Sequence, residues 1–150
     1  MIFTRDEEVN ELAEAFEERT LAKSDWTHAA HLVVGLYYCY NHPFGIAKNL
    51  MTDGIHWLND AHGTPNTKTS GYHETITVFW LKTVNEYLDR TGRGKGLAEL
   101  ANGLLADCND PHLPLKYYSR ERLFSTEARM HLVEPDLKNF ALSVNEQAVI

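Results

Sequence analysis

Three clusters of polar side chains interrupt segments of the chain that are otherwise apolar. The first, WTHAAH, contains His28 and His31; the second, GYHET, contains His73 and Glu74; the third, KYYSRER, contains Arg120. Imidazole titrates close to neutral pH and is also the commonest metal ligand in proteins. The first two clusters are therefore candidates for acid–base or metal chemistry.

Three imidazoles that converge form a typical metal site, because three protein ligands leave one coordination position open for water or substrate. We therefore expect His28, His31 and His73 to bind a divalent transition metal (Zn, Fe or Cu), with Glu74 as base or fourth ligand. Two histidines with Glu74 would instead give the facial arrangement suited to non-haem iron. The spacing by itself is weak evidence, since HxxH lacks the glutamate of the HExxH motif and ExxH does not occur in the chain.

The same side chains offer chemistry without a metal. His31 or His73 would act as a general base of near-neutral pKa that Glu74 orients. The structural alternative is that a histidine near a helix start is simply hydrogen-bonded within the fold. The other histidines lie in expected loops or on mixed helix faces, and we predict that they are ordinary surface residues: His42, His56, His62, His112 and His131.

Four further side chains are candidates for binding a substrate or assisting its reaction. Tyr72 or Tyr118 would donate a hydrogen bond, and Arg120 would hold a carboxylate or phosphate. Trp26 would form part of the substrate-binding wall. The structural alternatives are that Tyr118 packs in the core and that the SRER segment is a solvated helix face with local Glu–Arg pairs.

Two strongly apolar segments position the histidines. Residues 24–40 and 72–90 are apolar over most of their surface, which predicts two buried helices, each with histidines in its first turn. Ser24 or Asp25 is the expected cap of the first of these helices. A strand over the first six residues of the second is the alternative that its Thr, Val and Ile content permits. If the two helices pack side by side and parallel, their starts meet.

The remaining elements are also helical. Thr4 followed by Glu7 predicts a capping box before an amphipathic first helix that ends near Arg19. A polar loop at residues 63–71 has a length that is often functional. The predicted fold is therefore all-α, a single-domain bundle (1–150) of four or five main helices plus short C-terminal helices. Two further main helices are expected at residues 43–61 and 97–108. Two short helices are expected within residues 117–131, and residues 135–150 are expected to be a weakly ordered tail or an arm that packs on the fold.

Composition restricts the classes of partner. The formal net charge of −7 and the pI of about 5.6 argue against nucleic-acid binding, and the acidic opening segment is expected to be a solvated helix face. No window is apolar enough to span a membrane, and no signal peptide is evident. Cys39 and Cys108 are expected to be two buried thiols in a reducing cytosol rather than one disulfide. We predict a cytoplasmic protein that binds a small molecule; a homo-oligomer is compatible with the sequence.

The motifs WTHAAHLVVGLYY, SGYHETITVFW and YYSRERLFSTEAR resemble, in that order, a family of small bacterial all-helical proteins of uncharacterised activity. The resemblance extends over residues 16–134. It implies that the candidate residues act together as one constellation, and it implies no reaction. No Rossmann, P-loop, GxSxG or kinase pattern is present, so a nucleotide or flavin cofactor is not expected.

Two hypotheses of function follow. The first is a small-molecule enzyme with a histidine-centred pocket that binds a transition metal. The second is a non-catalytic ligand-binding or accessory protein that uses the same pocket. A purely scaffolding protein is a third reading, and it requires His28 and His73 to lie far apart.

Overall fold

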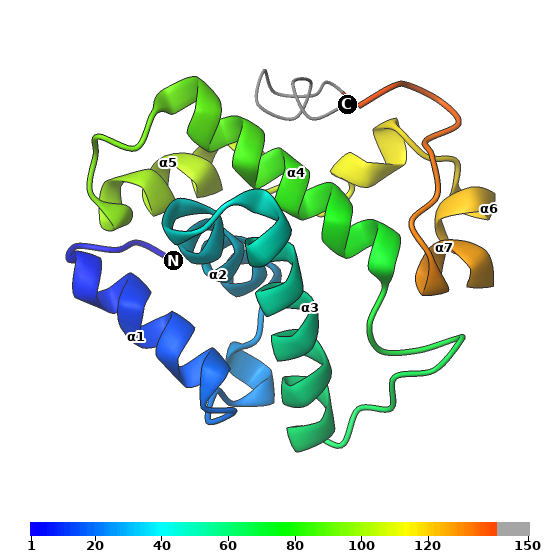
Figure 1. Ribbon diagram of the computed structural model, residues 1–150, viewed down its shortest axis with the longest axis horizontal. Coiled ribbons are helices and arrows are strands. Elements are labelled where there is room, and N and C mark those ends of the chain that lie inside the picture. The colour runs from blue at the N-terminus through cyan, green and yellow to red at the C-terminus, as the bar shows by residue number, and fades with distance from the viewer. Residues whose placement is uncertain (141–150) are drawn as a thin grey trace.

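Five long helices and two short ones make up the part of the chain that the computed structural model describes, residues 1–140 (Figure 1). This part contains no strand, so the predicted all-α class with main helices followed by short C-terminal ones is confirmed. Residues 72–77 therefore do not form the alternative strand. The helices are α1 (Asp6–Glu17), α2 (His28–Asn41), α3 (Phe44–Ala61), α4 (Glu74–Thr91), α5 (Leu97–Cys108), α6 (Arg120–Leu123) and α7 (Thr126–Met130).

Helix α2 lies at the centre of the fold, between α1, α3, α4 and α5 (Figure 1). Val33, Val34 and Leu36 are completely buried, as expected for a helix without a polar face. Helices α2 and α4 run in the same direction. Their first halves meet where the His28 ring packs edge-on against Trp80, and the Arg93 guanidinium, just beyond α4, donates to the Cys39 carbonyl near the end of α2. The two helices therefore lie side by side and parallel, and the start of α2 lies against Trp80 of α4.

The start of α2 differs from the prediction. Thr27 is the cap, and its hydroxyl accepts a hydrogen bond from the Ala30 amide at 3.2 Å. Ser24 and Asp25 instead belong to a single 3₁₀ turn. Thr, Ser and Asp are all good caps, so propensity alone does not choose among them. With Thr27 as the cap, His28 is the first helical residue.

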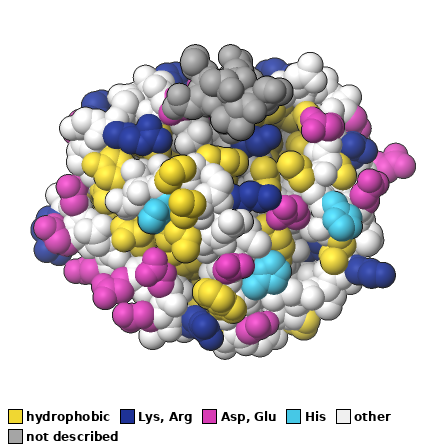
Figure 2. Space-filling view, viewed as in Figure 1, with side chains coloured by type: hydrophobic (Ala, Val, Ile, Leu, Met, Phe, Trp, Pro, Cys, Tyr) yellow, Lys and Arg dark blue, Asp and Glu magenta, His cyan; other side chains and the backbone are white. Residues whose placement is uncertain are grey.

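Helix α1 is also capped one residue away from the expected position. The Glu8 carboxylate, rather than that of Glu7, accepts from the backbone amides of Thr4 and Arg5, each at 2.9 Å. The Thr4 hydroxyl also donates to this carboxylate at 2.8 Å, and this bond, together with the two amide bonds, holds the pKa of Glu8 below its usual range. The acidic side chains of α1 are mostly exposed and gather at the lower left of the face shown in Figure 2, which agrees with the expected solvated acidic helix face.

The C-terminal segments pack on the outer side of α4. Phe79 of α4 contacts Tyr117 and Phe140, with ring centroids 5.2 Å apart in both pairs. The Asp136 carboxylate accepts hydrogen bonds from the amide and hydroxyl of Ser119. The first part of the predicted tail is thus a packed arm up to residue 140, and residues 141–150 lie outside the described residues.

No helix within residues 1–140 is long and apolar enough to cross a membrane. Cys39 and Cys108 are not joined by a disulfide. Cys39 is buried, as expected, whereas Cys108 is only partly buried.

Two glycines of α3 provide a test of the core packing. A methyl group at Gly54 would overlap Phe16 ring atoms Cε2 and Cζ, and Phe16 is completely buried. A methyl group at Gly45 would have no described atom within 4 Å. We expect Gly54→Ala to lower the free energy of unfolding by about 1–3 kcal/mol through overpacking. The same change at Gly45 should raise it by up to about 1 kcal/mol, because alanine restricts the unfolded chain.

Urea denaturation of the two variants measures both effects. Equal changes of the same sign would show that the α1–α3 contact at Gly54 is looser than described.

Candidate functional site

An apolar cavity of about 280 Å³ lies between α2, α3 and α4. His28 and His31 lie on its wall, together with the partly exposed Thr77. Most of its surface is hydrocarbon, which is typical of small-molecule sites. Its apolar lining includes Leu32, Met51, Ile55, Trp80, Leu81 and Val84.

His28 lines this cavity and contains a buried polar atom. Its Nε2 is inaccessible to solvent and forms no hydrogen bond with the described residues. Its ring lies 4.7 Å from the Trp80 ring, centroid to centroid. Burial lowers the pKa of His28, with a smaller opposing effect from Asp110. His28 is therefore neutral at pH 7.

His31 is fixed in a single neutral form. Its Nδ1 lies 2.7 Å from the Thr27 carbonyl oxygen, which only accepts, so Nδ1 bears the proton and Nε2 is left as an acceptor. The ring stacks on Trp26 with centroids 3.6 Å apart. Burial lowers the pKa of His31 to about 4; the bond to Thr27 opposes this shift and nearby His28 adds to it.

A second, more polar cavity of about 390 Å³ adjoins the first. The two cavities share the lining residues His31, Ile55, Ile76 and Thr77. The polar cavity extends from these residues toward the 3₁₀ turn before α2 and the 63–71 loop. Its further lining includes Lys23, Trp26, Asn59, His62, Tyr72 and His73.

His73 reaches this polar cavity, but both of its ring nitrogens are engaged. It is the cap of α4, and its Nδ1 accepts from the Ile76 amide at 3.1 Å. Its Nε2 must then bear the proton, which it donates to the Leu123 carbonyl at 2.7 Å. Burial lowers the pKa of His73, so the ring is neutral. His73 joins the start of α4 to α6 and has no lone pair left for a ligand or metal.

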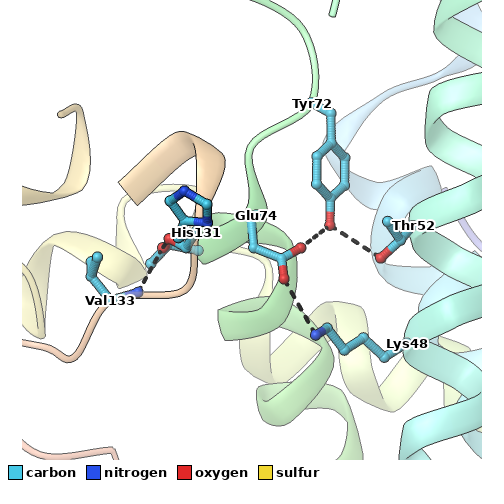
Figure 3. A network of polar contacts seen from close by, with 7 residues as sticks. Lys48, Thr52, Tyr72, Glu74, His131 and Val133 are labelled. Carbon is cyan, nitrogen blue, oxygen red and sulfur yellow. Dashed lines mark hydrogen bonds and ion pairs between the residues drawn. The ribbon is translucent and has the colours of Figure 1, made fainter. Parts of the chain in front are cut away.

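Glu74 and Tyr72 belong to a network that joins the start of α4 to α3 (Figure 3). The Tyr72 hydroxyl donates to the Glu74 carboxylate at 2.6 Å, and the Thr52 hydroxyl lies 3.1 Å from the Tyr72 oxygen. Lys48 forms a salt bridge with the other Glu74 oxygen at 3.3 Å. Burial and the bond to Glu74 raise the pKa of Tyr72, so the phenol stays protonated. Glu74 thus orients Tyr72 rather than a histidine.

Tyr118 and Arg120 are not part of either cavity. Tyr118 is buried on the outer side of α4, where its hydroxyl donates to the Val133 carbonyl at 2.7 Å. Burial raises its pKa. Arg120 is exposed at the start of α6. The structure therefore does not bring these two residues together with the histidines, and their functional roles stay predictions.

Several residues of the site were not predicted. Lys48, Thr52 and His56 lie four residues apart on one face of α3, and this polar row in an amphipathic helix is a signal that the sequence contains. Arg129 donates to the Gly71 and Tyr72 carbonyls at 2.7 and 3.3 Å, and no spacing pattern indicates this contact.

Two histidines predicted to be ordinary surface residues are instead partly buried. The His56 ring packs on Tyr72 with centroids 4.4 Å apart, and its Nδ1 lies 2.8 Å from the Thr52 carbonyl. The His62 Nε2 lies 2.7 Å from the Leu21 carbonyl. The prediction for these two is wrong because helix and loop packing covers faces that the sequence pattern leaves mixed.

Within residues 1–140, no three His, Cys, Asp or Glu side chains are arranged to hold a metal ion. The described geometry places His28 and His31 on one wall and commits His73 to backbone groups. The transition metal therefore stays a prediction that this geometry does not support.

Comparisons of the chain with family models, with curated proteins and with solved structures gave no match. The resemblance to the uncharacterised bacterial family, the cytoplasmic location and the homo-oligomer accordingly remain predictions.

Proposed function

We propose that this chain binds a small, mainly apolar molecule in the apolar cavity, with His28 and His31 holding a polar group of that molecule. The observation that supports this most is the buried Nε2 of His28, which lacks a partner among the described residues. A buried polar atom without a hydrogen bond costs about 1–3 kcal/mol, so an unpaired Nε2 in a residue that lines a cavity calls for an explanation. A ligand group that bonds to it would offset this cost.

The charge of the cavity supports an apolar ligand body. The apolar cavity is lined by no Asp, Glu, Lys or Arg among the described residues, and both imidazoles are neutral at pH 7. The transfer of hydrocarbon from water to such a surface is favourable by roughly 0.8 kcal/mol for each buried CH₂ group. Specificity would come from the polar side chains of the lining, which are the two imidazoles and Thr77.

Amide NMR with 1-octanol as the probe tests this proposal. Burial of about seven methylene groups predicts a dissociation constant on the order of 0.1 mM. Saturable shifts should be confined to residues around His28, Ile55 and Trp80. Shifts that never saturate, or that are spread over the surface, would contradict the proposal.

A cavity-filling variant provides the control. Thr77 lines both cavities and is only partly buried, so Thr77→Phe should place a ring in the cavity and abolish saturable binding of 1-octanol. The matched variant Thr126→Phe changes an exposed residue of α7 and should bind as the original chain does. If Thr77→Phe does not fold, Ile76→Phe fills the same shared region.

Catalysis by His31 is a second candidate function. The bond from Nδ1 to the Thr27 carbonyl leaves Nε2 as a proton acceptor on a residue that lines both cavities, and a free acceptor nitrogen is what a general base requires. A base with a pKa of about 4 is weak at neutral pH. Catalysis therefore requires the bound ligand to raise the pKa of His31 toward neutrality. An NMR titration of the imidazole in the presence of 1-octanol measures this pKa. An unchanged pKa would leave binding as the function.

A further inference from the structure

We propose that the ligand is an amphipathic hydroxycarboxylate whose hydrocarbon body occupies the apolar cavity, whose hydroxyl contacts His28 and His31 and whose carboxylate lies near Lys23. This inference rests on the proposed function and names the chemical class of the molecule bound. It depends on how the two cavities adjoin and on which groups in them are still available to a ligand.

The two cavities are placed so that one molecule can occupy both. They share four lining residues, which form the junction between them, and one of these is His31 with its imidazole ring. One side of the junction is hydrocarbon, and the other side contains amide, hydroxyl and ammonium groups. A ligand that extends from one cavity to the other must therefore be apolar at one end and polar at the other.

Most polar groups on the wall of the polar cavity are already hydrogen-bonded within the protein. The Nε2 of His62 pairs with the Leu21 carbonyl, and the Asn59 amide donates to the Asn66 side chain at 2.9 Å. The Tyr72 hydroxyl donates to Glu74. Each of these bonds uses a donor that a ligand carboxylate would otherwise find on the wall.

Lys23 is the available charge. It lines the polar cavity, and it forms no salt bridge with a carboxylate of the described residues. Neither cavity is lined by an Asp or Glu from residues 1–140, and Glu74 is paired with Lys48. A ligand head in this cavity therefore meets a positive charge without a competing negative one, which favours a carboxylate over an ammonium group.

The hydroxyl follows from the form of His31. Because Nδ1–H is bonded to the Thr27 carbonyl, the Nε2 of His31 accepts a hydrogen bond and has none to donate. A ligand hydroxyl at the junction donates to it, whereas a carboxylate at that point would place two acceptors together. The carboxylate therefore belongs farther along, on the Lys23 side.

Titrations with four probes of equal chain length test the inference: 3-hydroxyoctanoate, octanoate, 1-octanol and octylamine. We expect 3-hydroxyoctanoate to bind most tightly and octylamine to bind roughly tenfold more weakly than octanoate. Lys23→Gln should weaken 3-hydroxyoctanoate about threefold, because Lys23 is exposed, and should leave 1-octanol unchanged. The control is Lys95→Gln, at an exposed lysine in the turn before α5 that lines neither cavity.

The outcomes separate the inference from the proposed function. If 1-octanol binds saturably and as tightly as 3-hydroxyoctanoate, or if octylamine binds more tightly than octanoate, the cavity is a binding site but the hydroxycarboxylate is wrong. If Lys95→Gln weakens the binding of 3-hydroxyoctanoate as much as Lys23→Gln does, the hydroxycarboxylate is likewise wrong. If none of the four probes binds saturably, the proposed function itself fails.

Discussion

Replacing His73 with alanine is expected to lower the free energy of unfolding by about 2–4 kcal/mol. Two losses add. The α4 cap contributes about 1 kcal/mol, and the buried Leu123 carbonyl loses its donor, which costs about 1–3 kcal/mol. The effect should extend beyond α4, because the second bond holds α6 against the start of that helix. Urea denaturation at pH 7 measures the total.

Two further variants divide this effect into its parts. His73→Asn keeps a good cap but is too short to reach Leu123, so it should recover about 1 kcal/mol relative to alanine. His131→Ala removes an exposed imidazole after α7 and should change stability by less than about 0.5 kcal/mol. If His73→Ala were as mild as His131→Ala, the ring of His73 would be available for another role, including the metal that the sequence suggests.

The pH dependence of stability should depend strongly on His31. Its pKa is about 4 in the folded chain and 6.5 without perturbation. Between these values the unfolded chain binds a proton that the folded chain does not. The contribution of His31 to the free energy of unfolding is therefore complete above about pH 6.5. As the pH falls toward 4, this contribution is lost, and the free energy of unfolding decreases by a total on the order of 3 kcal/mol.

Comparison with a variant isolates the contribution of His31 from other titrating groups. His31→Gln should unfold with a shallower dependence on pH between 7 and 4.5, whereas His131→Gln, at an exposed site, should keep the original slope. His28 and His73 also have lowered pKa values and contribute to the slope that remains. Equal slopes in the His31→Gln variant and the original chain would show that His31 is solvated and that the cavity is not as apolar as described.

The fold was largely predictable because helical periodicity and capping residues determine it locally. Helix α3 spans Phe44–Ala61, within one residue of the expected range 43–61, and the two apolar segments became the adjacent helices α2 and α4. The errors at helix starts were small. They arose where several residues of equal propensity compete, as with Thr27 and Ser24, and the outcome depends on tertiary packing.

The site was predictable only in part. Placing His28 and His31 on a buried helix start requires only the apolar pattern of that helix, and the structure agrees. The role of His73 depends on Leu123, fifty residues away, and no pattern in the sequence specifies which carbonyl will face an imidazole. Arg120 is a candidate for anion binding because of its charge, but charge does not reveal whether a short helix faces a cavity or solvent.

Long-range ¹H–¹⁵N NMR of the imidazole nitrogens at pH 7, with and without 1-octanol, tests the central claim most directly. The account predicts neutral rings, with His31 protonated at Nδ1 and His73 at Nε2. It predicts that the probe shifts the Nε2 resonances of His28 and His31 with saturation and leaves those of His73 unchanged. Resonances of His28 and His31 that do not respond to the probe, or that shift no more than those of His73, would contradict it.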